Sequence, residues 1–332
     1  MELSEDELVA AISRVIATED PSVLVGPGDD AAVLARGSGE LVVTADLLVE
    51  DVHFERGSIA PHDLGAKAIA VNVSDIAAMG GSPRYALASV ALTPDVDEGW
   101  AMELAGGMRE ACLEYAMSLV GGDTNRADRV VIAVTVTGEV APGQAVTRAG
   151  ARPGDAIVVT GMLGGAAGGL ALSRSPDTIA TVLEQPDGRS LLEALQRPTA
   201  RVGEGQTLAA SGATAMMDLS DGLAKDLSRL CAASGVRARV HLIDVPVAPA
   251  LAEAADALDV DALDLALGGG EDYELLATLP ADLVEETATT LRERFGVALT
   301  RIGEIVDGSG ILAVDADGGE RPLAASGWDH FG

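Results

Sequence analysis

Apolar side chains follow two different spacings along residues 1–140. Short apolar or β-branched runs predict strands, whereas apolar residues three and four positions apart predict helices. The predicted strands lie at 41–44, 85–92 and 130–137, and the predicted helices at 63–79 and 97–117. Because strands alternate with helices, this part of the chain is expected to form an α/β domain.

Two Pro- and Gly-rich segments, 141–143 and 152–155, interrupt this pattern and predict a domain boundary. The chain is therefore divided into an N-terminal domain, 1–145, and a C-terminal domain, 146–332. The second domain is also expected to be α/β, with 176–188 as a loop or a partly helical excursion. Its strands are predicted at 156–160, 213–217, 237–243, 273–279 and near 298–305 and 311–315, and its helices at 166–172, 201–210, 222–233, twice between 243 and 273, and at 281–295.

Five short aspartate motifs stand out, each predicted to lie where a strand or a helix meets a turn. They occupy 28–30, 44–46, 72–75, 121–124 and 218–222. One aspartate in a turn is usually a capping device, but five such motifs together favour a site for hard, oxygen-seeking cations. Because Mg²⁺ usually binds together with phosphates, the motifs indicate a site that handles phosphate groups.

The spacing of Asn72 and Asp75 puts both side chains on one face of a helix that is otherwise apolar. Burial of an unpaired carboxylate is costly, so a metal-ligand role is favoured over a solvated face. Asp123 follows two glycines, which let backbone N–H groups approach an anion. Asp218 ends an apolar strand and Ser220 opens the next helix, whose positive end favours phosphate.

Two glycine-rich segments leave alternatives open. Residues 161–165 do not match the dinucleotide-binding fingerprint, and the chain has no P-loop motif. Tight helix–strand packing is favoured there over direct phosphate contact. Residues 268–273 place Glu271 and Asp272 beside three glycines, which indicates a ligand-binding edge, with a flexible loop as the alternative.

The chain of 332 residues has a formal net charge of −30, and Lys67 and Lys225 are its only lysines. Nucleic acid and anionic membranes are therefore poor partners. Self-repulsion of this size destabilises a compact state, which favours a halophilic source, where salt screens the charge; an ordinary acidic cytosolic enzyme is the alternative. With so few cationic side chains, bound metal must neutralise most of the phosphate charge.

Several other classes of protein and site are disfavoured. No run of 18 apolar residues predicts a membrane span, and the acidic N-terminus lacks the basic start of a signal peptide, so a cytoplasmic location is expected. Cys112 and Cys231 fall in helical patterns, which predicts buried thiols rather than a disulfide. The four scattered histidines form neither a convincing Ser-His-Asp arrangement nor a zinc site. The Trp328 side chain is equally expected to fill a packing gap in the protein or to stack on a ring of a ligand.

Eight segments carry a resemblance to known proteins: GPGDDAAV, TADLLVEDVHF, KAIAVNVSDIAAMGG, LVGGDT, AVTRAGARPGD, MMDLSDGL, GGGEDYEL and GWDHF. In this order, from about residue 26 to the C-terminus, they closely resemble the thiamine-monophosphate kinase family. The wider superfamily includes aminoimidazole ribonucleotide synthase, selenophosphate synthetase and a hydrogenase-maturation protein. The reactive N-terminus of selenophosphate synthetase and the C-terminal cysteine of the maturation protein are absent here, whereas His53 and Trp328 favour the kinase.

The resemblance implies an α/β (α+β), two-domain aminoimidazole ribonucleotide synthase-like fold. Its N-terminal domain binds ATP and Mg²⁺ and pairs with a second copy to form a homodimer. The implied reaction is Mg²⁺-dependent, direct in-line transfer of the ATP γ-phosphate to thiamine monophosphate, which yields thiamine diphosphate and ADP. Several Mg²⁺ ions are implied, with ATP as co-substrate.

The resemblance also assigns site residues, with no side chain as a catalytic acid or base, because positioning and metal electrostatics perform the transfer. Metal ligands are implied at Asp30, Thr44, Ala45, Asp46, Asp75, Asp123, Asp218 and Asp221, nucleotide contacts at Gly122, Asp123, Arg148 and Ser220, and substrate contacts at His53, Glu271 and Trp328. Two positions depart from the family pattern. Ala45 replaces a common hydroxyl residue, and Asp51 stands where glycine is common.

Two other functions remain as alternatives. The chain could be another ATP-dependent enzyme of the same superfamily that acts on a different small molecule. It could also be a non-catalytic protein that binds nucleotide or metal. The identity of the phosphate acceptor distinguishes the kinase from other enzymes of the superfamily. Turnover of ATP distinguishes either enzyme from a non-catalytic binding protein.

Overall fold

The structure is a computed structural model that describes residues 11–25, 33–34, 37–184 and 187–328. The chain divides into two compact units. The first unit is Met1–Ile76 with Gly81–Gly143, and the second is Ala77–Gly80 with Gln144–Gly332. Across the described ranges, no helix has both the length and the apolar character needed to cross a membrane.

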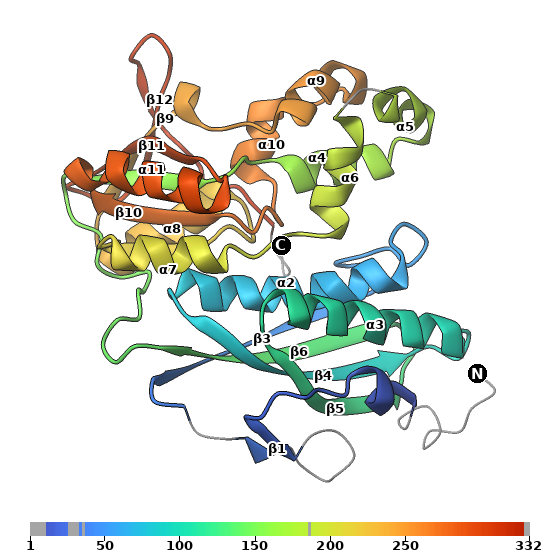
Figure 1. The fold of residues 1–332 in the computed structure, drawn as a ribbon. Helices are drawn as coiled ribbons and strands as arrows, with labels where there is room; N and C mark the ends of the chain where they lie inside the picture. Colours follow the sequence, from blue (N-terminus) through green and yellow to red (C-terminus); the bar gives the residue numbers. More distant parts are fainter. Residues whose placement is uncertain (1–10, 26–32, 35–36, 185–186, 329–332) are drawn as a thin grey trace. The chain divides into compact units, whose positions relative to one another are not determined.

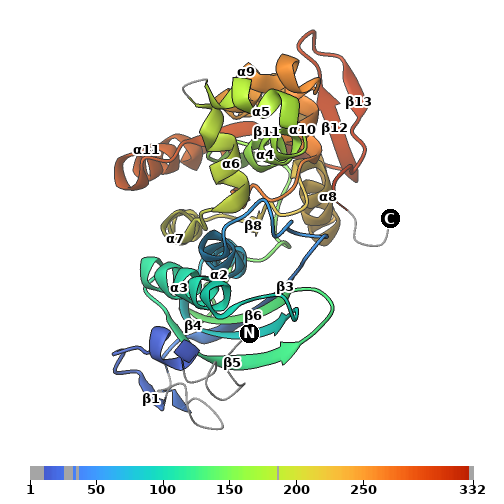
Figure 2. The same ribbon diagram turned by 90° about the vertical axis from the view of Figure 1, so that its right-hand side faces the viewer.

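The first unit is built on a four-stranded sheet in the order β3-β6-β4-β5. Its strands are β3 (Glu40–Val49), β4 (Ser82–Leu92), β5 (Ser118–Arg126) and β6 (Val131–Val140), and its helices are α2 (Pro61–Ala78) and α3 (Glu98–Glu114). Strand β6 pairs antiparallel with β3 and β4, whereas β4 and β5 are parallel and are joined through α3. Both helices lie over the same face of the sheet (Figures 1 and 2).

The two helices approach closely because glycines lie between them. A Cβ atom on Gly107 of α3 would lie 1.8 Å from the carbonyl oxygen of His62 on α2. This contact accounts for a glycine inside a long helix, where glycine otherwise lowers helix stability. Helix α3 ends at Glu114, three residues before the predicted end at 117, and Ala116 has a left-handed φ of 52°.

The opposite face of this sheet carries exposed apolar side chains. Alternate residues of a strand point to opposite faces, and the burial along β6 alternates accordingly, with Val134 and Val136 buried under the helices. On the other face Leu41 is 70%, Val43 56% and Leu47 50% exposed. A short additional ribbon of β1 (Val23–Val25) and β2 (Val33–Leu34) belongs to the same unit.

The second unit is built on a seven-stranded sheet in the order β13-β12-β9-β11-β7-β10-β8. Its pairs are antiparallel except for β12 with β9. The strands are β7 (Asp155–Thr160), β8 (Ala215–Asp218), β9 (Arg237–His241), β10 (Leu275–Pro280), β11 (Leu299–Val306), β12 (Gly310–Val314) and β13 (Glu320–Pro322). Strand β13 was not predicted, since its residues are all exposed and carry no apolar signal.

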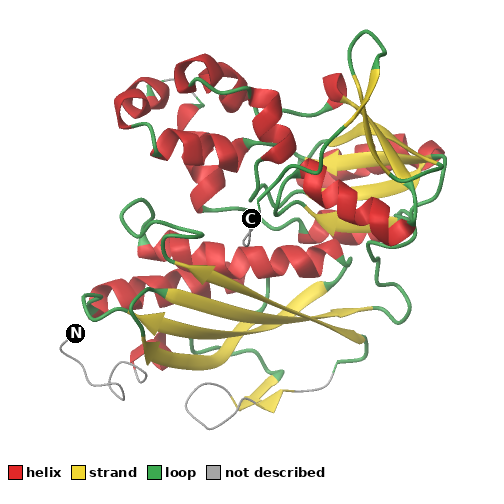
Figure 3. Cartoon of the chain, turned by 180° about the vertical axis from the view of Figure 1, so that it is seen from behind, coloured by secondary structure: helices red, strands yellow, loops and turns green. Residues whose placement is uncertain are grey.

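Helices cover both faces of the second sheet (Figure 3). One core joins the strands to α7 (Val202–Ala210) and α11 (Val284–Phe295), and another joins them to α8 (Leu223–Ser234) and α10 (Ala262–Gly268). A separate helical core gathers α4 (Gly165–Ser173), α5 (Pro176–Leu183), α6 (Gly188–Gln196) and α9 (Pro249–Leu258). The sequence did not predict α6, and α11 begins at Val284 after a 3₁₀ turn rather than at 281.

The prediction that the aspartate motifs lie at turns is wrong for three of them. Strand β3 continues through 44–46, β5 continues through 121–123, and 72–75 lies inside α2. In β5 a Cβ on Gly122 would lie 1.7 Å from the carbonyl oxygen of Ala88 on β4, so this glycine permits close strand pairing instead of a turn. The motif at 218–222 does separate β8 from α8, as predicted, and 28–30 lies outside the described residues.

Candidate functional site

In the first unit, β3 and α2 bring three of the predicted metal ligands together. Thr44 Oγ1 donates a hydrogen bond to Asp75 Oδ2 at 2.5 Å. The backbone N–H of Asp46 donates to Asn72 Oδ1 at 2.9 Å, and Asn72 Nδ2 donates to the carbonyl of Ala68 at 3.0 Å. The buried Asn72 therefore fixes the β3 backbone to α2 by hydrogen bonds, while Asp46 and Asp75 supply the carboxylates.

The electrostatics of this cluster fit a cation. Asp46 keeps an accessible surface, yet desolvation of its carboxylate, followed by the charge of Asp75, raises its pKa to about 6. Two neighbouring carboxylates, with the Thr44 hydroxyl beside them, offer the hard oxygen donors that Mg²⁺ prefers. Thr44, Asp46 and Asp75 could therefore hold this ion, with the carbonyl of Ala45 on the same strand.

Asp123 does not join this cluster within one chain. The register aligns Leu47, Ala133, Ser89 and Asp123 in a row across the sheet. Paired residues project from the same face, so Asp123 is on the exposed face with Leu47, whereas Asp46 is on the helix-covered face. Strands β3 and β5 are also three strand spacings apart, or about 14 Å. Gly122 and Asp123 are thus on the far edge strand of this sheet.

His53 follows β3 in a tight turn. Its Nδ1 accepts the backbone N–H of Val49 at 3.0 Å, which places the hydrogen of a neutral ring on Nε2. Asp51, one of the two departures from the family pattern, has a left-handed φ of 64°. A left-handed residue favours glycine, so the backbone explains why glycine is common at this position.

In the second unit, the turn after β8 is held by a residue that the sequence analysis missed. Asp226 Oδ2 accepts the backbone N–H groups of Ser220 at 3.1 Å and Asp221 at 2.9 Å. Asp226 is fully buried, and burial is the main cause that raises its pKa. Arg229 Nη1 contacts Asp226 Oδ1 at 2.7 Å. Only the isolated acid inside the apolar pattern of α8 could have indicated this role.

Four predicted site residues meet around this turn. The N–H of Glu271 donates to the carbonyl of Ser220 at 2.8 Å, and the N–H of Trp328 donates to the carbonyl of Asp221 at 3.1 Å. Lys225 Nζ donates to the carbonyl of Trp328 and lies 3.5 Å from Asp221 Oδ2. The Trp328 residue is 47% exposed. The turn therefore carries candidate nucleotide and substrate contacts side by side.

Two other predicted ligands have different surroundings. The Asp221 carboxylate already pairs with Arg229 Nη2 at 2.6 Å, so a metal ion there competes with an arginine. Asp218 is buried at the end of β8, opposite Leu275 of β10. Arg148 is exposed in the loop before β7, where its carbonyl accepts the Ser234 hydroxyl at 3.0 Å.

The remaining sequence predictions divide as follows. Asp30 lies outside the described residues. Within the described ranges, no group of three or more His, Cys, Asp or Glu side chains is arranged to hold a metal ion. Cys112 and Cys231 are buried free thiols, as predicted, and burial raises their pKa values to about 12 and about 11.

Comparison with known proteins decides the family. Residues 28–140 match "AIR synthase related protein, N-terminal domain", and residues 152–315 match the corresponding C-terminal domain. Thiamine-monophosphate kinase of Escherichia coli strain K12 is 36% identical over 332 residues, which cover 100% of this chain and 99% of that protein. This chain belongs to the thiamine-monophosphate kinase family.

Solved structures agree with this family. The crystal structure of thiamine-monophosphate kinase from Stenotrophomonas maltophilia K279a is 40% identical, with a TM-score of 0.84 over 97% of this chain and 99% of that one. AaThiL complexed with AMPPCP and TMP is 32% identical, with a TM-score of 0.76 over 99% and 98% of the two chains. The two-domain AIR synthase-like fold inferred from the sequence is thereby confirmed.

Proposed function

We propose that this chain transfers the γ-phosphate of ATP to thiamine monophosphate, which yields thiamine diphosphate and ADP. The observation that carries the proposal is similarity over the whole chain, at 36% identity, to an enzyme named thiamine-monophosphate kinase. A relative of the same fold binds AMPPCP and TMP. The oxygen-rich cluster on β3 and α2 adds the chemistry that a phosphate-handling site needs.

Charge neutralisation is the main physical problem of this reaction, because two phosphate-bearing substrates repel each other. Mg²⁺, when bound, supplies that neutralisation and orients the phosphate oxygens. Thr44, Asp46 and Asp75 hold it in the first unit. Asp218 is a candidate ligand in the second unit, and Asp221 is one if Arg229 releases it.

The acceptor phosphate is its own nucleophile. A phosphate monoester has a second pKa of about 6, so it is largely a dianion at neutral pH. No side chain then has to remove a proton, and the chain's task is to align acceptor and donor in line. Arg148 offers an exposed guanidinium to the nucleotide phosphates.

Three candidate contacts to the thiamine moiety follow from the family motifs: Trp328 is exposed, whereas Glu271 and His53 are half-buried. Trp328 stacks on the cationic or aromatic ring of the substrate. Glu271 accepts a hydrogen bond from the aminopyrimidine, and the family motif also assigns a substrate contact to His53. These roles follow the family motifs and are tested by substitution.

A homodimer completes the site in this proposal. The exposed Leu41, Val43 and Leu47 form an apolar stripe that a second copy would cover. Asp123 projects from this same face, away from Asp75 of its own chain. In a dimer, Asp123 of one copy would therefore join Asp75 of the other copy at one site.

The net charge of −30 further favours a protein adapted to high salt, where the repulsion between two such subunits is screened.

The deciding experiment is incubation of the purified protein with ATP, Mg²⁺ and thiamine monophosphate in molar KCl. Chromatography should show thiamine diphosphate and ADP in equal amounts. ATP binding without diphosphate formation would refute the proposal and favour a sister enzyme or a binding protein. Omission of Mg²⁺ and replacement of the acceptor by thiamine are the matched controls.

A further inference from the structure

The segment 268–274, which joins α10 to β10, contains two non-glycine residues in the left-handed region. Glu271 has a φ of 68° and Tyr273 a φ of 50°. Residues with a Cβ seldom adopt this conformation, and they keep it only where surrounding contacts enforce it. The contacts that enforce it here therefore also decide where Glu271 lies.

On one side, the segment is bonded to the turn after β8. The N–H of Tyr273 donates to the carbonyl of Leu219 at 2.9 Å, and the N–H of Glu271 donates to that of Ser220 at 2.8 Å. The carbonyl of Glu274 accepts the N–H of Leu219 at 2.9 Å. These backbone bonds continue the β8–β10 pairing in an irregular form and hold Glu271 against Ser220.

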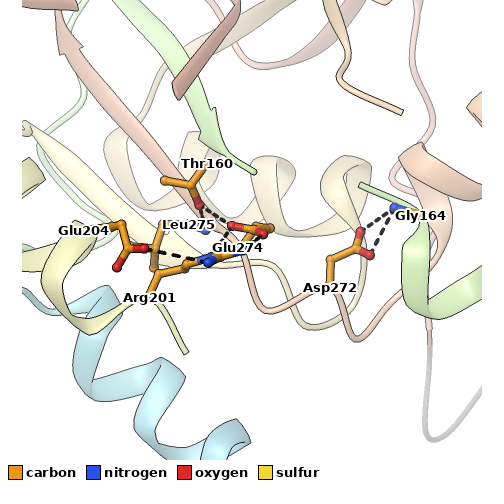
Figure 4. Close-up of polar contacts among 7 residues, drawn as sticks. All are labelled: Thr160, Gly164, Arg201, Glu204, Asp272, Glu274 and Leu275. Atoms are coloured by element: carbon orange, nitrogen blue, oxygen red, sulfur yellow. Dashed lines mark hydrogen bonds and ion pairs between the residues drawn. The ribbon is translucent and has the colours of Figure 1, made fainter. Parts of the chain in front are cut away.

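On the other side, Asp272 reaches away from this turn to the first residues of α4 (Figure 4). Its Oδ1 and Oδ2 accept the N–H of Gly164 at 3.0 and 2.9 Å, and the N–H groups of Gly165 and Ala166 also face it. The carboxylate thus satisfies helix N–H groups that have no partner within the helix. It occupies the place where a phosphate would bind, so the amides at the start of α4 already have a partner from the chain itself, in line with the packing interpretation of residues 161–165.

Two residues further on, Glu274 forms a second anchor. Its carboxylate accepts Arg201 Nε at 2.8 Å and Nη2 at 2.5 Å, and the Thr160 hydroxyl donates to it at 2.6 Å (Figure 4). Glu274 is 5% exposed. Asp272 and Glu274 therefore fix the segment on both sides of Tyr273, from elements that carry no predicted substrate contact.

We propose that Asp272 is a positioning residue, which caps α4 and, with the Glu274–Arg201 pair, holds Glu271 in its left-handed conformation beside Ser220. This proposal rests on the proposed function, because Glu271 is the predicted contact to thiamine monophosphate. It assigns to Asp272 no contact with substrate. Its loss acts on the substrate only through Glu271.

The kinetic test is a double-mutant cycle of Asp272→Ala and Glu271→Ala. Asp272→Ala should raise KM for thiamine monophosphate about tenfold, with less than about a twofold change in KM for ATP. The double variant should be no worse than Glu271→Ala, since both changes remove the same contact. Asp272→Asn, which keeps an acceptor oxygen for Gly164, should restore most of the affinity. Additive effects, or equal losses for both substrates, would overturn the proposal.

Asp155→Ala is the matched control, because Asp155 is a buried acid at the other end of β7. It accepts the N–H of Arg152 at 2.9 Å and the Thr214 hydroxyl at 2.7 Å. Its substitution removes buried carboxylate bonds from the same sheet and should leave KM for thiamine monophosphate unchanged. An equal rise in that KM would mean that general loosening of the sheet, rather than positioning by Asp272, explains the effect.

Hydrogen exchange separates this proposal from the proposed function. In Asp272→Ala the amides of Glu271 and Tyr273 should lose protection at least about tenfold relative to wild type, and in Asp155→Ala they should not. Unchanged protection in Asp272→Ala would overturn the positioning role whether or not the protein is a kinase. A wild-type protein without kinase activity, but with this exchange pattern, would refute the substrate assignment and leave the positioning of Glu271 supported.

Discussion

Thr44 Oγ1 donates to Asp75 Oδ2 at 2.5 Å, and this bond joins β3 to α2 where both elements carry oxygen ligands. The bond orients the Asp75 carboxylate toward β3. The Asn72 amide holds the backbone of Asp46 on the same strand. Helix and strand thus present their carboxylates together.

Replacement of Asp75 by Asn tests this arrangement. The amide keeps the size and one acceptor oxygen but removes the charge that Mg²⁺ requires, so kcat should fall by roughly 10²-fold or more and half-saturation by Mg²⁺ should rise. Steady-state kinetics over a Mg²⁺ titration would measure both. Asp63→Asn, the same change in the first turn of α2, is the control and should retain activity. Near-wild-type turnover of Asp75→Asn would remove Asp75 from the metal site.

A subunit-mixing experiment tests whether Asp123 serves the partner's site. Asp75→Asn and Asp123→Asn should each inactivate the enzyme alone. If each site takes Asp75 from one copy and Asp123 from the other, a mixed dimer contains one intact site, and random co-assembly restores about a quarter of wild-type activity. If both carboxylates come from one chain, every site in the mixture stays damaged and no activity returns. Val43→Glu should abolish the recovery by separating the subunits.

Much of the fold could be predicted from the sequence, because long periodic segments signal their elements locally. The α2 and α8 patterns, and the strands β4, β6 and β7, were all expected within a few residues of their observed bounds. Strand β13 was not predicted because its three exposed residues form a strand only by pairing with β12. Local periodicity carries no information about such a partner.

The sequence predicted the carboxylates of the candidate site. It did not predict the side chains that hold the surrounding loops in place. Gly122 was expected in a turn, yet it lies within β5, because the carbonyl of Ala88 approaches it across the sheet. Asp226 and Arg201 act on residues that are five to 73 positions away in the sequence. A short motif contains no information about such distant partners, so only the tertiary structure shows which side chains hold the loops.

Trp328→Ala should weaken binding of thiamine monophosphate more than it slows phosphate transfer. The residue is 47% exposed and its backbone is bonded to Asp221 and Lys225, so truncation removes the ring while these backbone bonds can persist. KM for thiamine monophosphate should rise about tenfold, and Trp328→Phe should recover part of it. Trp100→Ala, on α3, is the control. An unchanged KM would exclude stacking by this ring.

The stability of the protein should increase with salt and then level off. The sequence carries 52 acidic residues against 22 basic ones, and their repulsion is screened as the Debye length falls to about 3 Å at 1 M salt. The unfolding temperature should therefore rise steeply with KCl at low concentration and reach a plateau near 1 M. If the unfolding temperature kept rising linearly above 1 M KCl, the cause would be a general effect of salt on the burial of apolar surface rather than charge screening. A flat response would contradict adaptation to high salt.

Asp272 should make stability fall as pH rises. Burial is the largest cause that raises its pKa from 3.8 to about 8, and the α4 amides oppose this shift only in part. The folded protein then keeps a proton that the unfolded chain releases near pH 4. This contribution to the free energy of unfolding is complete below about pH 4, declines between about pH 4 and pH 8, and is absent above about pH 8. Its slope is at most about 1.4 kcal/mol per pH unit.

Urea unfolding of wild type and Asp272→Asn between about pH 5 and pH 9 tests this prediction. The difference between their free energies of unfolding isolates the contribution of Asp272, because the amide does not titrate. The difference should change in favour of the variant as pH rises and become constant above about pH 8. The opposite slope would mean that the helix amides outweigh burial and hold Asp272 ionised.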